Sequence, residues 1–169
     1  GSFDEELPAP IYALDRTVGI LELWHGPTCA FKDFALQILP YLLTTSAKKI
    51  DSGKIVILVA TSGDTGKAAL EGFKNVKGTD IIVFYPSDGV SSMQKLQMDS
   101  QEGENVCVCA IKGNFDDAQS GVKRIFTDKA ISAKLTENSM AFSSANSINW
   151  GRLCPQIVYY FSAYCDLLA

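Results

Sequence analysis

The sequence predicts an α/β fold, an open four-stranded parallel sheet with helices on both faces. Two observations predict it. Four short apolar runs within residues 54–145 alternate with segments of helical periodicity. The runs are apolar on both faces of the strand, as strands buried between two helical layers are. Right-handed crossovers would join them into one compact unit.

The expected elements of this unit follow from composition in chain order. Strands are expected at Lys54–Ala60 (KIVILVA), Asp80–Tyr85, Asn105–Ile111 and Met140–Ser143. Helices are expected at Asp64–Phe73, Ser91–Asp99 and Asp116–Lys134, with Ser91 and Asn114 as N-caps. Ligands bind beyond the carboxyl ends of parallel strands, so the loops at 61–66 and 144–152 should share one sheet edge.

The flanking segments are less regular. Residues 3–19 read as extended and mixed, and residues 20–24 form a short apolar run that predicts a strand. A helix is expected over residues 32–48, with Pro40 kinking or interrupting it because proline lacks an N–H donor. A last helix is expected from residue 148 or 155 to the end of the chain.

Composition excludes several classes of protein. The 169 residues suit one domain, or one domain plus pieces of another, and the net charge of -4 argues against nucleic acid as the main partner. No apolar run approaches the roughly 18 residues of a membrane-spanning helix. Five cysteines without a CxxC pair favour buried, inert thiols in a reducing cytoplasm. A single histidine, His25, argues against a zinc site, so no metal is expected.

The first candidate anion site is the loop Thr61-Ser62-Gly63-Asp64-Thr65-Gly66, which follows one strand and begins a helix. Hydroxyl groups and free backbone N–H groups at a helix N-terminus attract anions. The spacing matches neither the Walker loop nor the dinucleotide fingerprint, so we expect a small carboxylate or phosphate. A plain strand-to-helix turn explains this loop equally well.

The second candidate anion site follows the fourth strand and consists of Asn146, Ser147, Asn149 and Arg152. A guanidinium group suits phosphate because it donates two hydrogen bonds at once. Read alone, these residues are better explained by a capped helix with a solvated arginine. A third candidate, Lys32, lies between aromatic residues where a helix begins, which favours the neutral amine that Schiff-base chemistry requires. An ordinary first-turn lysine is the alternative.

Together, these segments resemble threonine synthase, a pyridoxal-phosphate enzyme of the tryptophan-synthase-β-like, or fold type II, superfamily. The matching stretches are LELWHGPTCAFKD (21–33), ATSGDTG (60–66), GNFDDAQ (113–119) and SANSINWGR (144–152). The resemblance implies conversion of O-phospho-L-homoserine and water to L-threonine and phosphate, in the cytoplasm. It implies that Lys32 carries pyridoxal 5'-phosphate as an aldimine and then moves protons on the substrate.

The resemblance also assigns the two loops. It implies that the loop of Thr61, Ser62, Gly63, Asp64 and Thr65 holds the substrate α-carboxylate. Asn146, Ser147, Asn149 and Arg152 would hold the substrate phosphate. His25 and Phe31 would shape the lysine pocket or serve the structure alone, and Lys95 is either a second cation or a solvated lysine.

The resemblance divides the chain into four parts. Residues 1–2 read as a tag scar, 3–53 as a lysine-bearing strand and helix of the large domain, 54–145 as the small domain, and 146–169 as the first helix of the return to the large domain. The family's glycine-rich loop for the cofactor phosphate lies further downstream, and no glycine follows Gly151 here. We therefore expect this chain alone to be inactive and to self-associate through residues 34–43 or 157–168.

Two other functions remain open at this point. One is a threonine-synthase-like phospholyase that eliminates phosphate and yields a 2-oxo acid. The other is a non-catalytic α/β module that binds anions at the two loops without a cofactor.

Overall fold

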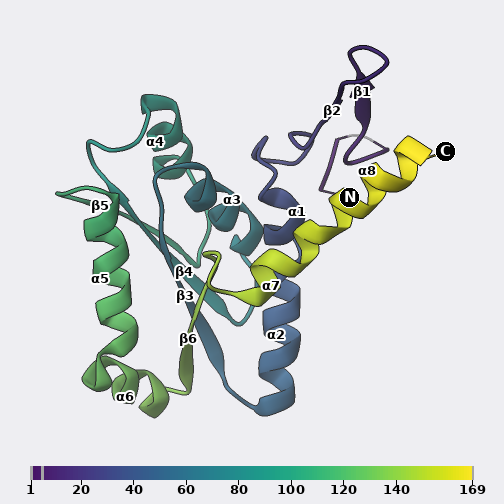
Figure 1. The fold of residues 1–169 in the computed structure, drawn as a ribbon. Helices are drawn as coiled ribbons and strands as arrows, with labels where there is room; N and C mark the ends of the chain where they lie inside the picture. Colours follow the sequence, from purple (N-terminus) through teal and green to yellow (C-terminus); the bar gives the residue numbers. More distant parts are fainter. Residues whose placement is uncertain (1, 5, 169) are drawn as a thin grey trace.

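The computed structural model describes residues 2–4 and 6–168. Gly1 of the expected tag scar and Ala169 of the expected 146–169 segment therefore lie outside the described residues. A sheet of four parallel strands lies at the centre, in the spatial order β5-β4-β3-β6 (Figure 1). The strands are β3 (Lys54–Ala60), β4 (Thr79–Pro86), β5 (Val106–Ile111) and β6 (Met140–Ser144). The predicted fold class is confirmed.

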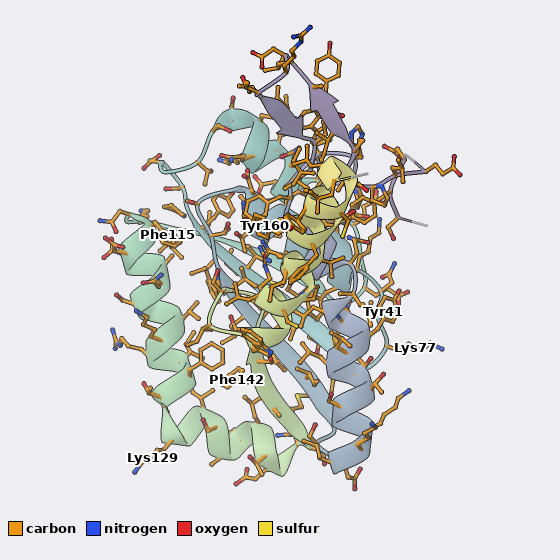
Figure 2. The ribbon with its side chains drawn as sticks, turned by 45° about the vertical axis from the view of Figure 1, so that its right-hand side comes forward. Tyr41, Lys77, Phe115, Lys129, Phe142 and Tyr160 are labelled. Atoms are coloured by element: carbon orange, nitrogen blue, oxygen red, sulfur yellow. The ribbon has the colours of Figure 1, made fainter. Side chains whose placement is uncertain are left out.

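Helices cover both faces of this sheet, and β3 shows why. Its residues alternate between two cores, with Ile55, Ile57 and Val59 in one and Val56, Leu58 and Ala60 in the other. The first core packs against α2 (Leu39–Ile50), α3 (Asp64–Phe73) and α4 (Ser92–Asp99). The second packs against α5 (Phe115–Thr127) and α6 (Lys129–Glu137), where Phe142 of β6 meets Phe126 at 5.4 Å between ring centroids (Figure 2).

The prediction of one continuous helix over residues 116–134 is wrong, because Asp128 divides this segment into α5 and α6. The Asp128 carboxylate accepts hydrogen bonds from the N–H groups of Ala130 at 2.8 Å and Ile131 at 3.1 Å. A carboxylate that caps a new helix in this way competes with continuation of the preceding one.

The interruption predicted at Pro40 is confirmed. A short helix, α1 (Asp33–Leu36), ends before α2 begins at Leu39, and Pro40 is the second residue of α2. Proline is tolerated there because the first turn of a helix has no partner for its N–H groups.

The flanking segments lie together on one side of the sheet (Figure 1). β1 (Ile11–Ala13) pairs antiparallel with β2 (Gly19–Leu21), so the expected strand at 20–24 begins earlier and ends sooner, and its partner was not predicted. The last helix is divided into α7 (Trp150–Leu153), a 3-10 turn at Cys154–Gln156 and α8 (Ile157–Leu168). Within the described residues, every helix is too short or too polar to span a bilayer.

A glycine contact docks α1 onto α3. Gly72 of α3 lies against the backbone of α1, and a Cβ atom at this position would overlap the carbonyl oxygen of Leu36. Glycine therefore sets the distance between α3, which follows the 61–66 loop, and α1, which follows Lys32.

Candidate functional site

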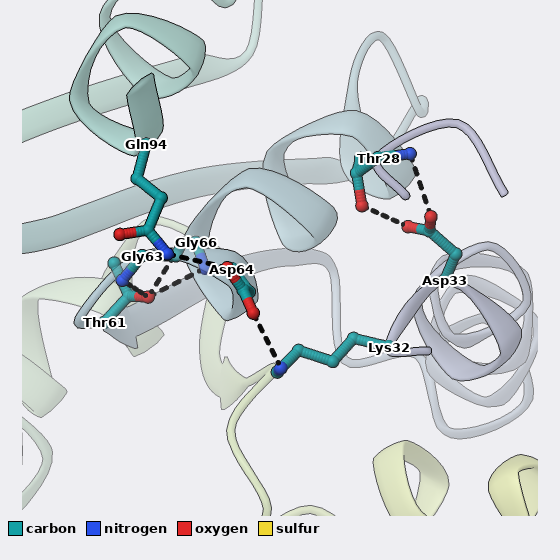
Figure 3. Close-up of polar contacts among 8 residues, drawn as sticks. All are labelled: Thr28, Lys32, Asp33, Thr61, Gly63, Asp64, Gly66 and Gln94. Carbon is teal, nitrogen blue, oxygen red and sulfur yellow. Dashed lines mark hydrogen bonds and ion pairs between the residues drawn. The ribbon is translucent and has the colours of Figure 1, made fainter. Parts of the chain in front are cut away.

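Lys32 and the 61–66 loop, which are about thirty residues apart in sequence, meet in space (Figure 3). The Nζ atom of Lys32 lies 3.4 Å from Oδ2 of Asp64, and it also lies 4.3 Å from the centre of the Phe31 ring. The lysine side chain is 17% exposed and that of Asp64 is 53% exposed. The amine is therefore held between a carboxylate and an aromatic face, with a path to solvent.

Asp33 fixes the loop that presents Lys32. Its carboxylate is fully buried and accepts hydrogen bonds from the N–H of Thr28 at 2.9 Å and from Oγ1 of Thr28 at 2.7 Å. Gly26 makes room for it, because a Cβ atom there would lie 2.6 Å from Oδ2 of Asp33. Burial raises the pKa of Asp33, although the hydrogen bonds from Thr28 act in the opposite direction.

The 61–66 loop is organised by Thr61, which is 2% exposed. Its Oγ1 accepts hydrogen bonds from the N–H groups of Gly63 at 3.0 Å and Gly66 at 2.9 Å. Those bonds leave the N–H groups of Asp64 and Thr65 without a partner among the described residues, at the start of α3. The threonine hydroxyl shapes the loop, and these two N–H groups can bind an anion.

The loop after β6 lies beside it, so the prediction that both loops share one sheet edge is confirmed. The side chain of Asn146 joins them, since its Nδ2 donates to the Ala60 carbonyl at 2.9 Å and its Oδ1 accepts from the Ala60 N–H at 3.3 Å. Asn149 accepts from the N–H of Gly151 at 2.9 Å and donates to the Ser144 carbonyl at 2.8 Å. Both asparagine side chains therefore also hold the fold.

Arg152 is buried, with 3% of its surface exposed. Its Nε and Nη1 atoms have no hydrogen-bond partner among the described residues. Burial lowers the pKa of Arg152, and the nearby Tyr159 and Asp33 oppose that effect only in part. A buried guanidinium with free donors is costly unless an anion pairs with it.

Two cavities flank the 61–66 loop. The first, here called the lysine cavity, has a volume of about 430 Å³ and is lined by Phe31 and Asp64, which both contact Nζ of Lys32. It is lined by Leu21, Leu23, Trp24, Cys29, Ala30, Phe31, Asp64, Tyr159 and Tyr160. The second, here called the loop cavity, has a volume of about 340 Å³. It is lined on one side by Thr61, Ser62, Thr65, Asn146 and Ser147, and on the other by α5.

The structure brings most of the sequence-predicted site residues together. Ser62 and Ser147 are exposed on the loop cavity, whereas Arg152 and Asn149 do not line it. His25 pairs with Glu22 at 2.7 Å, and Lys95 is exposed. The described residues contain no cluster of three or more His, Cys, Asp or Glu side chains suited to a metal ion.

Two contributions to the site were not predicted. Gln94 of α4 donates from Nε2 to Oδ1 of Asp64 at 2.7 Å, and Lys123 of α5 lines the loop cavity. The Ser91-x-x-Gln94 spacing is the signature of a capping box. It predicts that Gln94 caps α4, but it does not predict that Gln94 also contacts Asp64. Lys123 lies on an amphipathic helix, and the sequence alone does not tell whether a polar residue of such a helix lines a cavity or faces solvent.

Comparison with known proteins gives relatives over nearly the whole chain. No known protein-family model matches it. The threonine synthase-like 1 protein of Pongo abelii is 45% identical over 167 residues, with 95% of this chain and 22% of that protein covered. The threonine synthase of Pseudomonas aeruginosa is 44% identical over 167 residues, with 99% of this chain and 34% of that protein covered.

A solved structure agrees with these relatives. The pyridoxal-phosphate-bound threonine synthase of Brucella melitensis has a TM-score of 0.87 and 41% identity, with 98% of this chain and 34% of that chain covered. The chain thus spans between about a fifth and a third of the length of the proteins it matches. Over that segment, this chain is a homologue of the threonine synthases and the threonine synthase-like proteins.

Proposed function

We propose that the protein containing this chain is a threonine synthase, a pyridoxal-phosphate-dependent lyase of threonine biosynthesis that converts O-phospho-L-homoserine and water to L-threonine and phosphate. The observation that carries the proposal is the position of Lys32, whose amine meets the 61–66 loop at Asp64 beside an aromatic cavity. A reactive amine next to an anion-binding loop is the arrangement that an amino-acid substrate needs.

The residues around Lys32 suit pyridoxal 5'-phosphate. The lysine cavity adjoins the neighbours of Nζ and has aromatic walls at Trp24 and Tyr160, which suit a flat ring. Its volume lies in the range of small-molecule sites, which is roughly 300–1,000 Å³. Lys32 would hold the cofactor by a covalent bond from Nζ, and the bound cofactor would act as an electron sink for charge that develops on the substrate.

The loop residues would hold the substrate. The free N–H groups of Asp64 and Thr65, at the positive end of α3, would bind the α-carboxylate. Thr61 keeps these N–H groups in place, and Ser62 would add a hydroxyl donor at the edge of the loop cavity.

The segment after β6 would hold the substrate phosphate. Ser147 is exposed on the loop cavity, and Asn146 and Asn149 fix its backbone. Arg152 does not line the loop cavity, and support for it comes from its buried Nε and Nη1 atoms, which have no hydrogen-bond partner among the described residues and would gain from pairing with an anion. Positive charge at this place would favour departure of phosphate as an anion.

Lys32 would also move protons. With Nζ free and substrate bound, the amine of Lys32 would accept protons from the substrate carbons and return them. Asp64 would keep that amine directed toward the loop through the contact at 3.4 Å.

The rest of the protein would complete the site. We propose that residues 54–145 form the small domain, that residues 3–53 and 146–169 pack with the large domain, and that this chain alone is inactive. We also assign the protein to the cytoplasm. The expectation that its cysteines are buried is wrong, because Cys29, Cys107, Cys154 and Cys165 are exposed.

Product analysis of the full-length protein tests this proposal. Incubation with O-phospho-L-homoserine should release phosphate and L-threonine in equal amounts. Phosphate with a 2-oxo acid and ammonia would instead identify the phospholyase. A protein without visible cofactor absorbance, unchanged by Lys32→Ala, would identify the non-catalytic anion-binding module.

A further inference from the structure

Gln94 connects α4 to the candidate site through Asp64 (Figure 3). One oxygen of the Asp64 carboxylate accepts from Nε2 of Gln94 at 2.7 Å, and the other lies 3.4 Å from Nζ of Lys32. The three side chains therefore form a continuous polar chain from α4 to the reactive amine. The carboxylate stands between a neutral donor and a cationic one.

The orientation of the Gln94 amide is fixed from behind. Its Oε1 accepts hydrogen bonds from the N–H of Ser91 at 3.2 Å and from Oγ of Ser91 at 3.1 Å. Because both acceptor contacts lie on the Ser91 side, the NH₂ group must face Asp64. The capping box thus uses only the oxygen of the amide and leaves its nitrogen free for a second task.

The 61–66 loop makes room for this contact at Gly63. A Cβ atom there would overlap the amide group of Gln94, and the backbone φ of 146° belongs to a region that other residues rarely adopt. Gly63 immediately precedes Asp64, so the same residue admits Gln94 and turns the chain toward Lys32.

We propose that Gln94 is a positioning residue that acts on Lys32 through Asp64. Its hydrogen bond holds the half-exposed Asp64 carboxylate in the rotamer that faces Nζ. Without it, Asp64 would turn into solvent for part of the time and release the amine. The consequence for cofactor binding rests on the function proposed above, whereas the contact itself does not.

The reactivity of Lys32 in the cofactor-free, full-length protein tests the contact directly. Acetylation of Lys32 by a small reagent is followed by mass spectrometry, with the exposed Lys129 as the internal reference. Gln94→Met removes the donor and should raise the rate about two- to fivefold, the range expected for loss of a partly exposed ion pair. Gln97→Met, the same change one turn along α4, should leave the rate unchanged because Gln97 makes no side-chain hydrogen bond among the described residues.

Two further variants separate positioning from helix capping. Gln94→Glu keeps the acceptor for Ser91, and therefore the cap, but it removes the donor to Asp64 and places a second carboxylate beside it. Repulsion should turn Asp64 away from Nζ, so labelling should speed up as in Gln94→Met. A residue that only caps α4 would leave the labelling of Lys32 unchanged in Gln94→Glu. In an Asp64→Asn background, Gln94→Met should have no additional effect, since Gln94 acts through Asp64.

Equal effects of Gln94→Met with and without Asp64→Asn, or equal rates in Gln94→Met and Gln97→Met, would overturn the proposal. A second arm measures the rate of Schiff-base formation with pyridoxal phosphate, which needs the same free amine and should also rise about two- to fivefold in Gln94→Met. If labelling responds as expected but no variant binds pyridoxal phosphate, the positioning role stands and the proposed function fails. If the wild type binds the cofactor but labelling is indifferent to Gln94, the positioning role fails alone.

Discussion

Replacing Gly72 by alanine should separate the packing of α1 from the intrinsic stability of α3. A Cβ atom at position 72 would meet the Leu36 carbonyl oxygen, which is backbone and cannot rotate away. Alanine within a helix gains roughly 0.5–1 kcal/mol over glycine, and overpacking of this kind costs about 1–3 kcal/mol. The two effects oppose each other, so the stability change of Gly72→Ala alone is smaller than the true cost of the clash.

Gly121 supplies the matched control. It lies within α5, and no atom lies within 4 Å of a Cβ built on it. Gly121→Ala should therefore show only the gain in helix stability. The difference in unfolding free energy between the two variants should then equal the cost of the clash, about 1–3 kcal/mol. Urea denaturation followed by circular dichroism measures both. Equal stabilities for the two variants would refute the close packing of α1 against α3.

The same substitution should reach the site. Moving α1 outward carries Lys32 away from Asp64, and a misplacement of about 1 Å can cost as much as ~100-fold in rate. Gly72→Ala should therefore change Lys32 acetylation and weaken binding of pyridoxal phosphate to the full-length protein, whereas Gly121→Ala should change neither. If Gly72→Ala lowers the free energy of unfolding but leaves Lys32 acetylation and cofactor binding unchanged, the packing of α1 against α3 does not position Lys32.

Three other predictions follow from burial and exposure. Burial and the 2.8 Å hydrogen bond to Asp99 raise the pKa of Tyr85 to about 12, so stability should fall as pH rises from about 10 to about 12, and Tyr85→Phe should remove that loss and the last tyrosinate absorbance step. Burial raises the pKa of Asp33, so the folded state keeps the carboxyl proton to a higher pH than the unfolded state does. The free energy of unfolding should therefore fall as the pH rises past the ordinary carboxyl pKa. Urea denaturation of Asp33→Asn in the acid range should not show this fall. This 169-residue chain should self-associate through α8, where Phe161 and Tyr164 are 66% and 63% exposed, and sedimentation should show Phe161→Glu shifted toward monomer.

Much of the fold was predictable because the apolar runs alternate with helical segments and because β3 is buried on both faces. KIVILVA carries apolar side chains toward both cores, a pattern that leaves little choice other than a covered parallel strand. The break between α5 and α6 was missed because Asp128 is an acceptable residue on a helix surface. Only the structure shows that its carboxylate caps the following turn.

The candidate site was predictable in its position more than in its details. Lys32, the 61–66 loop and the 144–152 loop were identified from residue type and topology, and they adjoin in space. The roles of individual side chains depend on contacts that spacing does not encode. Thr61 and Asn146 bond to backbone groups of their own loops and strand ends, and Gln94 reaches the site from another helix.

The proposed function assigns the cofactor of a threonine-forming enzyme to Lys32. The most direct measurement is borohydride reduction of the full-length protein with pyridoxal phosphate, peptide mapping of the product, and assay of the unreduced protein for L-threonine from O-phospho-L-homoserine. One pyridoxyl group is expected on the peptide that contains Lys32 and none in Lys32→Ala, with threonine formed only by the wild type. A pyridoxyl group on another lysine, or threonine formed by Lys32→Ala at the wild-type rate, would contradict it.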